Sequence, residues 1–328
     1  MKLSHMKLLM DEMHITSAAD IKNPANAARL QEAGIFPPYS ERGDFLLYQE
    51  LEMDSNYVDA HEDISYGKET VSLHSHRFWE IIYVKSGNLQ YLLGNTRYHL
   101  CADHLVIVPP GMSHRPLFTG EDTVPYDRIV IWISDTFAQN IIDKMQELEP
   151  LHLLKAHHQY VLHPSGSVQL ELEKTCESLL YEKTQSRIGN EISCLGMTTQ
   201  LFGLFCRASY LGNSSHIMPE KTSLLDEILH YIETHLSDTI SLSSIAEHFL
   251  VSQSAISHMF KKQMDVSFYQ VVIQRRLIES KNLILTGVPL KAIPERCGFS
   301  DYSVFYKAFV KEYGISPKQY KIHEFTTL

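Results

Sequence analysis

The sequence predicts an α+β protein in which an N-terminal β-barrel and a helical segment precede an all-α domain. Residues 44–135 contain short apolar runs separated by Gly, Asn, Asp and Pro, which is typical of a barrel or sandwich. Residues 136–211 and 222–328 instead repeat apolar residues at helical spacing. Between them, residues 212–221 (GNSSHIMPEK) have the composition of a linker.

Length and composition indicate a globular protein kept under reducing conditions. The chain has 328 residues, of which 44 % are hydrophobic and 21 % charged, so we expect about two domains. Its five cysteines are scattered without a CxxC pair, which favours reduced thiols and a cytoplasmic location. No run of about 18 apolar residues occurs, so we expect no membrane span. Residues 1–43 are expected to form a partly flexible arm, which starts at Met1 or Met6.

The barrel prediction rests on six runs within residues 44–135. They are DFLLYQELEM, FWEIIYVKSG, NLQYLLGN, TRYHLCA, DHLVIVPPG and DRIVIWIS. Each is long enough for one strand, and most are rich in β-branched or aromatic residues. The dipeptide Gly94-Asn95 separates the third run from the fourth and predicts the turn of a β-hairpin.

The next segment, residues 136–211, predicts three helices. The third of them, residues 191–211, is mostly apolar and therefore needs a partner surface. It either packs on the barrel or pairs with a second subunit, and we expect a homodimer with Leu201 and Leu204 in the contact. The first two helices each place apolar side chains on one face: Phe137, Ile141, Ile142 and Met145 in the first, and Leu172, Cys176, Leu179 and Leu180 in the second.

Residues 222–328 predict a bundle of seven short helices joined by short turns. Ser241, Ser252 and Asp301 precede apolar periodic runs and are expected to cap helices. The helices are expected near residues 222–236, 241–249, 252–263, 267–285, 290–297, 301–312 and 316–322.

The run SSIAEHFLVSQSAISHMF predicts a helix-turn-helix. Such a unit needs a small residue where its helices cross, here Ala246, and apolar residues at fixed offsets. The turn position usually taken by Gly is Leu250. The shared core is expected to contain Ile245, Phe249, Val251, Ile256 and Met259. The second helix exposes polar side chains suited to bases and phosphates, namely Gln253, Ser254, Ser257, His258 and Lys261.

The pattern recurs about 49 residues later in KAIPERCGFSDYSVFYKAFVKEYG, with Gly298 in the turn. Phe299, Phe305 and Phe309 take the positions of Val251, Ile256 and Phe260. One long helix joins the units, so both recognition helices are expected on one face of a duplex, about one helical turn apart. The exposed residues expected to contact DNA in the second unit are Tyr302, Ser303, Tyr306, Lys307 and Lys311.

The charge distribution agrees with a nucleic-acid partner at the C-terminal end. The net charge of −10 comes from residues 1–218, which hold 17 basic and 27 acidic residues. Residues 219–328 hold 12 of each, and residues 252–321 hold 11 basic against 5 acidic. A local basic surface is what phosphate contact requires.

These residues resemble the DNA-binding domain of the AraC/XylS family of bacterial transcription regulators. The resemblance is carried by SLSSIAEHFLVSQSAISHMFKK, by RRLIESKNLIL and above all by CGFSDYSVFYKAFVKEYGISPKQYK. It implies a regulator that binds promoter DNA and responds to a small-molecule effector, and that contacts RNA polymerase if it is an activator. The chain departs from the family pattern at Pro294, Asp265, Ala255 and Ile256.

A second resemblance lies in the barrel, in HSHRFWEIIYVKSG and PPGMSH. His74, His76 and Glu80 share strand parity, so their side chains are expected on one side. Together with His114 they resemble the metal-ligand pattern of cupin barrels, with Asp103 and Phe118 departing from it. Three His and one Glu suit Fe, Mn, Ni or Zn.

Three interpretations of these four residues remain open: an effector pocket, a metal site, and interior hydrogen bonding without a ligand. We favour the effector pocket, for a sugar or a related metabolite, and expect no cofactor. If a metal binds, we expect it at His74, His76, Glu80 and His114. The alternative function is a cupin metalloenzyme of dioxygenase or isomerase type with an appended DNA-binding domain. No phosphate-binding loop, dinucleotide motif or nucleophile elbow occurs, so we expect no enzyme.

Overall fold

The computed structural model describes residues 12, 25, 53–66, 71, 73–118, 124–144, 160–185, 187–210, 214–216 and 223–326. The expected N-terminal arm lies outside these residues except for Glu12 and Ala25. Met145 and the expected strand at 44–53, apart from Met53, also lie outside them.

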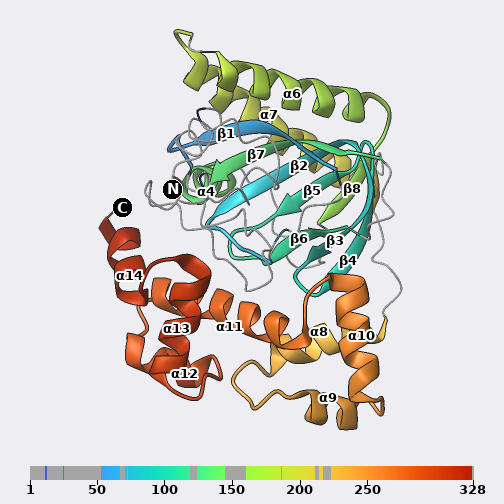
Figure 1. Cartoon of the computed structure of the whole chain (residues 1–328). Helices are drawn as coiled ribbons and strands as arrows, with labels where there is room; N and C mark the ends of the chain where they lie inside the picture. The colour runs from blue at the N-terminus through green and yellow to red at the C-terminus, as the bar shows by residue number, and fades with distance from the viewer. Residues whose placement is uncertain are drawn as a thin grey trace.

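The N-terminal part contains two antiparallel sheets (Figure 1). The larger has the order β1-β7-β2-β5-β8-β9, formed by Val58–Ser65, Tyr126–Ser134, Phe78–Ser86, Leu105–Val108, Val161–Pro164 and Ser214–His216. The smaller has the order β4-β3-β6, formed by Thr96–Cys101, Asn88–Leu93 and His114–Leu117. A bridge between His74 and His114 links the segment before β2 to the smaller sheet.

The continuous apolar runs in β2 and β7 arise because both faces of the larger sheet are buried. Ile81 and Tyr83 of β2 face the core shared with the helices, whereas Ile82 and Val84 face the space between the sheets. Period-2 alternation places successive residues on opposite faces, so a strand covered on both sides has no polar face. The hairpin predicted at Gly94-Asn95 joins β3 to β4.

Four strands were not expected from the sequence: β1, β6, β8 and β9. Strand β1 has the sequence VDAHEDIS, and its polar residues Asp59 and His61 are nevertheless buried. Strand β9 lies inside the expected linker 212–221 and pairs with β8. Within the predicted linker, Ser214–His216 thus form a short strand, because their backbone groups pair with β8.

Three helices, α4 (Asp135–Lys144), α6 (Gly166–Thr184) and α7 (Asn190–Tyr210), pack in one core with the larger sheet (Figure 1). Leu201 and Leu204 are fully buried in that core. Their expected place in a dimer contact is therefore wrong, because the sheet and α6 already cover this side of α7. No helix among the described residues is long and apolar enough to cross a membrane.

The C-terminal helices follow the sequence prediction closely. Ser241, Ser252 and Asp301 are confirmed as N-caps, since each side chain accepts a backbone N–H from the first turn of its helix. Pro294 lies in the first turn of α12, where a proline is tolerated because its missing N–H is not needed. The helices are α8 Leu224–Thr234, α9 Leu242–His248, α10 Gln253–Met264, α11 Phe268–Leu285, the 3₁₀ turn Leu290–Ala292, α12 Ile293–Arg296, α13 Tyr302–Tyr313 and α14 Pro317–Thr326.

Helix α11 joins two separate apolar cores. One contains Ile256 and Phe260 of α10, and the other contains Phe305 and Phe309 of α13. The first core also includes Leu73, Leu92 and Leu117 from the barrel. The smaller sheet therefore packs on the first helix-turn-helix unit, below the barrel in Figure 1. The predicted division into an N-terminal β domain and a C-terminal helical domain is confirmed.

Candidate DNA-binding surface and ligand site

The first recognition helix, α10, has one buried and one exposed side. Ile256, Phe260 and Met264 are buried and hold the helix in its core. Lys261 Nζ lies 2.6 Å from Asp265 Oδ1 and 3.2 Å from the Asp265 carbonyl oxygen. The side away from the core exposes every residue that the sequence predicts for DNA contact, namely Gln253, Ser254, Ser257, His258 and Lys261.

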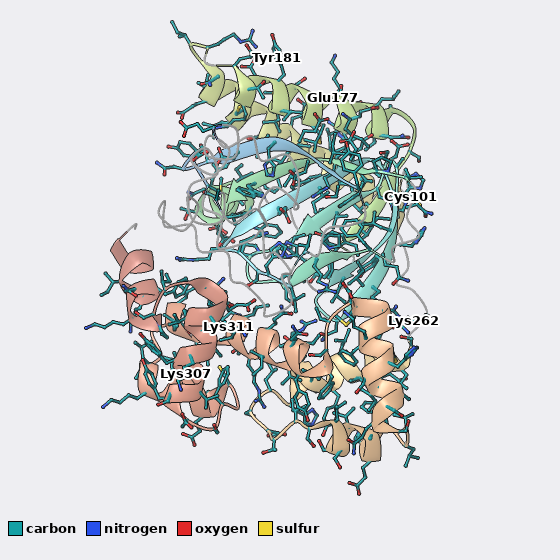
Figure 2. All side chains as sticks on the ribbon, viewed as in Figure 1. Cys101, Glu177, Tyr181, Lys262, Lys307 and Lys311 are labelled. Carbon is teal, nitrogen blue, oxygen red and sulfur yellow. The ribbon has the colours of Figure 1, made fainter. Side chains whose placement is uncertain are left out.

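The second recognition helix, α13, repeats this arrangement around buried Phe305 and Phe309. The backbone N–H of Val304 donates to Asp301 and thereby lowers the pKa of that carboxyl. All the predicted contact residues are again exposed: Tyr302, Ser303, Tyr306, Lys307 and Lys311. Figure 2 labels Lys307 and Lys311 on α13, and also Lys262 on α10. Exposed Lys262 was not predicted, although the Lys261-Lys262 pair in the sequence signals it.

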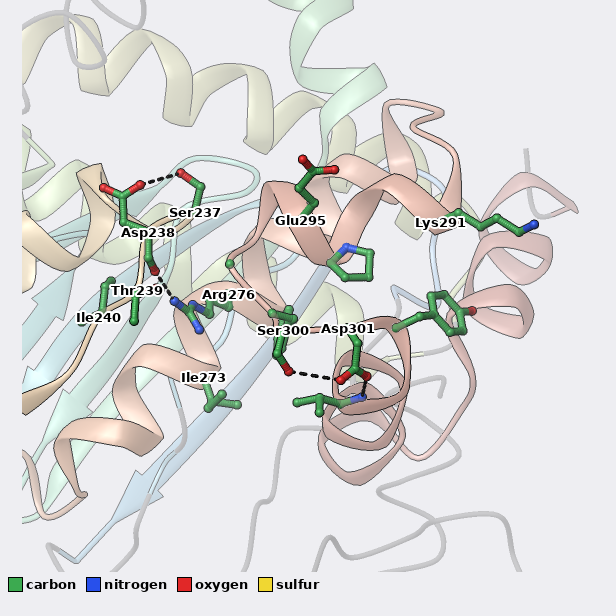
Figure 3. Close-up of a pocket in the computed structure, with 15 residues that line it drawn as sticks. Ser237, Asp238, Thr239, Ile240, Ile273, Arg276, Lys291, Glu295, Ser300 and Asp301 are labelled. Carbon is green, nitrogen blue, oxygen red and sulfur yellow. Dashed lines mark hydrogen bonds between the residues drawn. The ribbon is translucent and has the colours of Figure 1, made fainter.

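A cleft of about 720 Å³ lies between the two helix-turn-helix units (Figure 3). Arg276 of α11 forms part of its wall, and donates from Nε to Leu236 O (3.1 Å) and from Nη2 to Asp238 O (2.7 Å). Its guanidinium carbon also lies 5.9 Å from the centre of the Phe299 ring. Arg276 thus contacts both the turn before α9 in the first unit and Phe299 in the second. These contacts help to fix the relative orientation of the two units.

The structure brings together all four residues that the sequence predicts for the ligand site. His74 and His76 precede β2, Glu80 lies on β2, and His114 begins β6. Two backbone hydrogen bonds pair His74 with His114, at 2.9 and 3.3 Å. Glu80 Oε2 lies 3.0 Å from His114 Nε2 and 3.5 Å from His76 Nε2. The ring centres of His74 and His114 are 4.2 Å apart.

Further groups orient these side chains, and sequence reasoning missed them. Trp132 Nε1 donates to Glu80 Oε1 at 2.9 Å. Burial opposes ionisation of Glu80, but its contacts with His114 and His76 outweigh burial and hold its pKa well below the usual range. Burial lowers the pKa of His76. Because Trp132 and Glu80 are cross-strand partners of β7 and β2, only the strand register reveals this bond.

Arg97 of β4 connects the barrel to the first helix-turn-helix unit. Its Nε and Nη2 donate to the two carboxylate oxygens of Asp226, at 2.8 and 3.0 Å. It also reaches Ser223 Oγ at 2.7 Å and Gln263 Oε1 at 3.2 Å. Burial raises the pKa of Asp226, but the bonds from Arg97 and Ser223 reverse this and leave it below its usual value. A buried bidentate pair of this kind fixes orientation as well as distance.

Two cations of α11 contact the segments that carry the ligand-site histidines. Arg275 Nη1 lies 2.6 Å from Ser113 Oγ, and Lys281 Nζ lies 3.4 Å from Ser75 O. Arg275 also donates to the backbone oxygen of Gly94. Ser75 lies between His74 and His76, and Ser113 precedes His114. Helix α11 therefore contacts residues that are adjacent in sequence to the candidate ligand-site histidines.

Comparison with known proteins agrees with both parts of the structure. Residues 56–201 match the model for an AraC-like ligand binding domain, and residues 245–322 match that for a helix-turn-helix domain. The chain is similar to the xylose operon regulatory protein of Haemophilus influenzae, with 28 % identity over 34 % of this chain and 29 % of that protein. It is also similar to the arabinose operon regulatory protein of Escherichia coli, with 28 % identity over 40 % of this chain and 44 % of the other.

A third relative is matched over a greater length. It is the uncharacterized regulator YdiP of Escherichia coli, with 24 % identity over 74 % of this chain and 78 % of that protein. The chain spans less than half the length of the two sugar-operon regulators. The ligand-binding and helix-turn-helix models match in the order in which the barrel and the paired recognition helices occur. On this evidence the chain belongs to the AraC/XylS family of transcription regulators.

Proposed function

We propose that this protein is a sequence-specific DNA-binding transcription regulator that responds to a small-molecule effector. The main support for this proposal is that both recognition helices, α10 and α13, expose their predicted polar residues. Their opposite sides are buried in two separate cores. Polar and basic side chains on a helix held in this way can reach base edges and phosphates in a major groove.

The proposed effector is a sugar or a related metabolite, bound in the barrel near His76, Glu80 and His114. The support is that two relatives are named for xylose and arabinose operons, and that residues 56–201 match a ligand-binding model. Contacts of α11 with Ser75 and Ser113 provide a physical route from this site to the DNA-binding units. If the protein activates transcription, RNA polymerase is its further partner.

The proposed assembly is a homodimer. Leu170 and Tyr181 of α6 and Ile192 of α7 are exposed by 65 %, 55 % and 74 %. These side chains, unlike the buried Leu201 and Leu204, are exposed apolar groups of this layer that are available for pairing. Sedimentation of the full-length protein, compared with a Leu170→Lys, Ile192→Lys double variant, tests the assembly. A monomeric wild type at micromolar concentration contradicts it.

Binding-site selection from random DNA with the full-length protein tests the central proposal. We expect enrichment of a site with two conserved elements, and affinity that falls with salt at a log–log slope of about −4 to −6 per protomer. A slope near zero, or no enrichment, contradicts DNA binding through this surface.

A second candidate function is the cupin metalloenzyme with an appended DNA-binding domain. The observation that favours it is the convergence of His76, Glu80 and His114 on one point. It predicts turnover of a small substrate by the metal-loaded protein in the absence of DNA, whereas the relatives matched here are transcription regulators.

A further inference from the structure

We propose that Lys281 of α11 is a positioning residue that couples the barrel site to the second helix-turn-helix unit. Its ammonium group lies between the segment that carries His74 and His76 and two aromatic rings of the second unit. The coupling is thereby assigned to one side chain and to one of the two units, rather than to α11 as a whole. The effect on DNA affinity rests on the proposed function, whereas the coupling within the protein does not.

Lys281 meets the barrel at the backbone between the two candidate ligand-site histidines. Its Nζ lies 3.4 Å from the backbone oxygen of Ser75, and both residues are buried. The neighbouring His74 is held to His114 by two backbone hydrogen bonds. Because Ser75 is covalently joined to both His74 and His76, a displacement of the backbone at either histidine also displaces the Ser75 carbonyl.

The same ammonium group is anchored more broadly on the second unit. It lies 4.9 Å from the centre of the Tyr313 ring and 5.8 Å from the centre of the Tyr320 ring. Both distances are within the range of cation–π attraction, about 6 Å, and this attraction is strongest where water is excluded. The bond to Ser75 is long by comparison, since such bonds are strongest at about 2.9 Å. A small shift at Ser75 therefore strengthens or breaks the link to the barrel.

The two rings belong to the core behind the second recognition helix. Tyr313 ends α13, and Tyr320 of α14 is buried. The centre of the Phe309 ring lies 4.7 Å from that of Tyr313 and 5.7 Å from that of Tyr320. Phe309 is fully buried, whereas Tyr306 of the same helix is exposed. A close-packed core has few voids that could absorb a displacement of the rings, so α13 must move with them.

A carboxyl group of α13 lies within electrostatic range of the same ammonium. Burial raises the pKa of Glu312, and the charges of Lys311 and Lys281 partly oppose that rise. Glu312 directly precedes Tyr313 in the sequence. Charge and ring attraction from Lys281 therefore act on the same end of α13.

The first unit is connected to the barrel by different residues. Arg97 pairs with Asp226 of α8, and Arg115 donates to the backbone oxygen of Met264. Figure 1 shows α11 below the barrel, running from the first unit to the second. Because the two units have separate connections, loss of the Lys281 charge should uncouple the second unit and leave the first docked.

Amide hydrogen exchange of the full-length protein tests the coupling without DNA. His76→Ala serves as the perturbation of the barrel site, because it removes the ring whose Nδ1 lies 2.8 Å from Phe78 O. With Lys281 present, this substitution should change the protection of residues 309–320 at least about 5-fold. In the Lys281→Met background, which keeps the length of the side chain and removes its charge, the change should be less than about 2-fold.

Two further variants separate coupling from a purely structural role. Lys281→Arg restores a cation that can donate to a carbonyl and lie over aromatic rings, so it should recover at least about half of the change in protection. Tyr313→Leu removes a ring from the other side of the contact and should abolish the change although Lys281 is in place. The matched control is Lys183→Met, which removes a partly buried ammonium 3.2 Å from Asp59. The full change should persist in this control.

Circular dichroism establishes that each variant is folded. The coupling is overturned if His76→Ala changes protection of residues 309–320 equally with Lys281 and in folded Lys281→Met, or changes it in neither. An equal loss of the response at residues 256–264 overturns the assignment to the second unit. If Lys281→Met does not fold, Tyr313→Leu decides by the same criteria.

DNA binding by the same variants separates this coupling from the proposed function. The two conserved elements of the selected site are scrambled in turn. On the site that keeps the element altered by Tyr306→Ala, His76→Ala should change affinity at least about 5-fold, but not in the Lys281→Met background. Coupled exchange with unchanged DNA affinity overturns the role in regulation and leaves the proposed function intact. Coupled exchange in a protein that binds no DNA overturns the proposed function and leaves the coupling standing.

Discussion

The two helix-turn-helix units share one design but differ at the turn. Leu250 in the first and Gly298 in the second both adopt positive φ, 55° and 75°. A Cβ added to Gly298 would lie 2.1 Å from Leu236 O, whereas the Leu250 side chain is 92 % exposed. The turn needs a left-handed residue in both units. In the second unit alone, the backbone oxygen of Leu236 lies so close that the turn residue must be glycine.

The units also differ in their relation to the barrel. Arg97 contacts α8 and α10, and Arg115 donates to the backbone oxygen of Met264, so the first unit is docked directly. The described core of the second unit is built from residues of the C-terminal domain alone. A change in the barrel therefore reaches the first unit by direct contact, and reaches the second through α11.

The largest expected effect on the free energy of unfolding comes from substituting the residue at each turn. Gly298→Ala places a methyl group against backbone and should destabilise the second unit by about 4 kcal/mol. Its control, Leu250→Gly, relieves a left-handed leucine and should stabilise the first unit by about 1 kcal/mol. Urea unfolding measures both free energies. Equal and small effects would mean that the two turns are equivalent after all.

The next effect tests the docking of the first unit. Arg97→Ala removes one partner of a buried charge pair and leaves the Asp226 carboxylate unpaired. The free energy that holds the first unit against the barrel should therefore fall by about 3 kcal/mol. Hydrogen exchange should show loss of protection at Ser223–Asp226 and near Gln263. Arg128→Ala is the matched control, because Arg128 is equally buried and pairs with Asp63 (3.2 Å) inside the barrel. Loss of protection at the same helices in both variants would contradict direct docking by Arg97.

Acidification should act on the same contact. The pKa of Asp226 in the folded protein is below its usual value. The ionised carboxylate therefore stabilises the folded state at any pH above the pKa of Asp226 in the unfolded chain. This stabilisation is lost as pH falls through the pKa of Asp226 in the folded protein. We expect the docking of wild type to weaken below about pH 4. Arg97→Ala should show a smaller pH dependence of hydrogen exchange at α8 over that range. An unchanged pH profile in the variant would show that the Arg97–Asp226 pair is not the cause of the pH dependence.

A smaller effect distinguishes the two recognition helices. His258→Ala and Tyr306→Ala should each cost about 1–3 kcal/mol on the selected site and relax base preference. The affected base pairs should lie about ten apart if the two helices enter successive major grooves, as we expect. Selection with each variant measures this. A shift at the same base pairs in both variants, or at none, would rule out the two-groove arrangement.

The smallest effect concerns Lys261, whose ammonium group is paired with Asp265. Lys261→Ala should weaken binding to all sequences alike and make the salt slope shallower by about one unit. The exposed ion pair itself contributes little, so folding should change by less than about 1 kcal/mol. Filter binding across a salt series checks the slope. Altered base preference in this variant would assign Lys261 to base contact instead.

The helices of the C-terminal domain were predictable because their signals are local. Apolar spacing and the caps at Ser241, Ser252 and Asp301 act within one or two turns of chain. Strand β1 was not predictable, because buried Asp59 is polar and its partners are the N–H groups of Asp54 and Ser55 and the ammonium of Lys183. Lys183 is remote in sequence, and so nothing in the local pattern marks a buried strand.

The sequence by itself determined the architecture, the polar faces of both recognition helices and the common side of His76 and Glu80. Periodicity alone decides which residues share a face of a helix or strand. Tertiary structure decided that Leu201 and Leu204 face the sheet, that Trp132 holds Glu80, and that Arg97 meets Asp226. Arg97 and Asp226 are 129 residues apart, and such a contact depends on how the barrel and the helices pack. Packing between distant segments is a property of the whole fold, which local spacing does not encode.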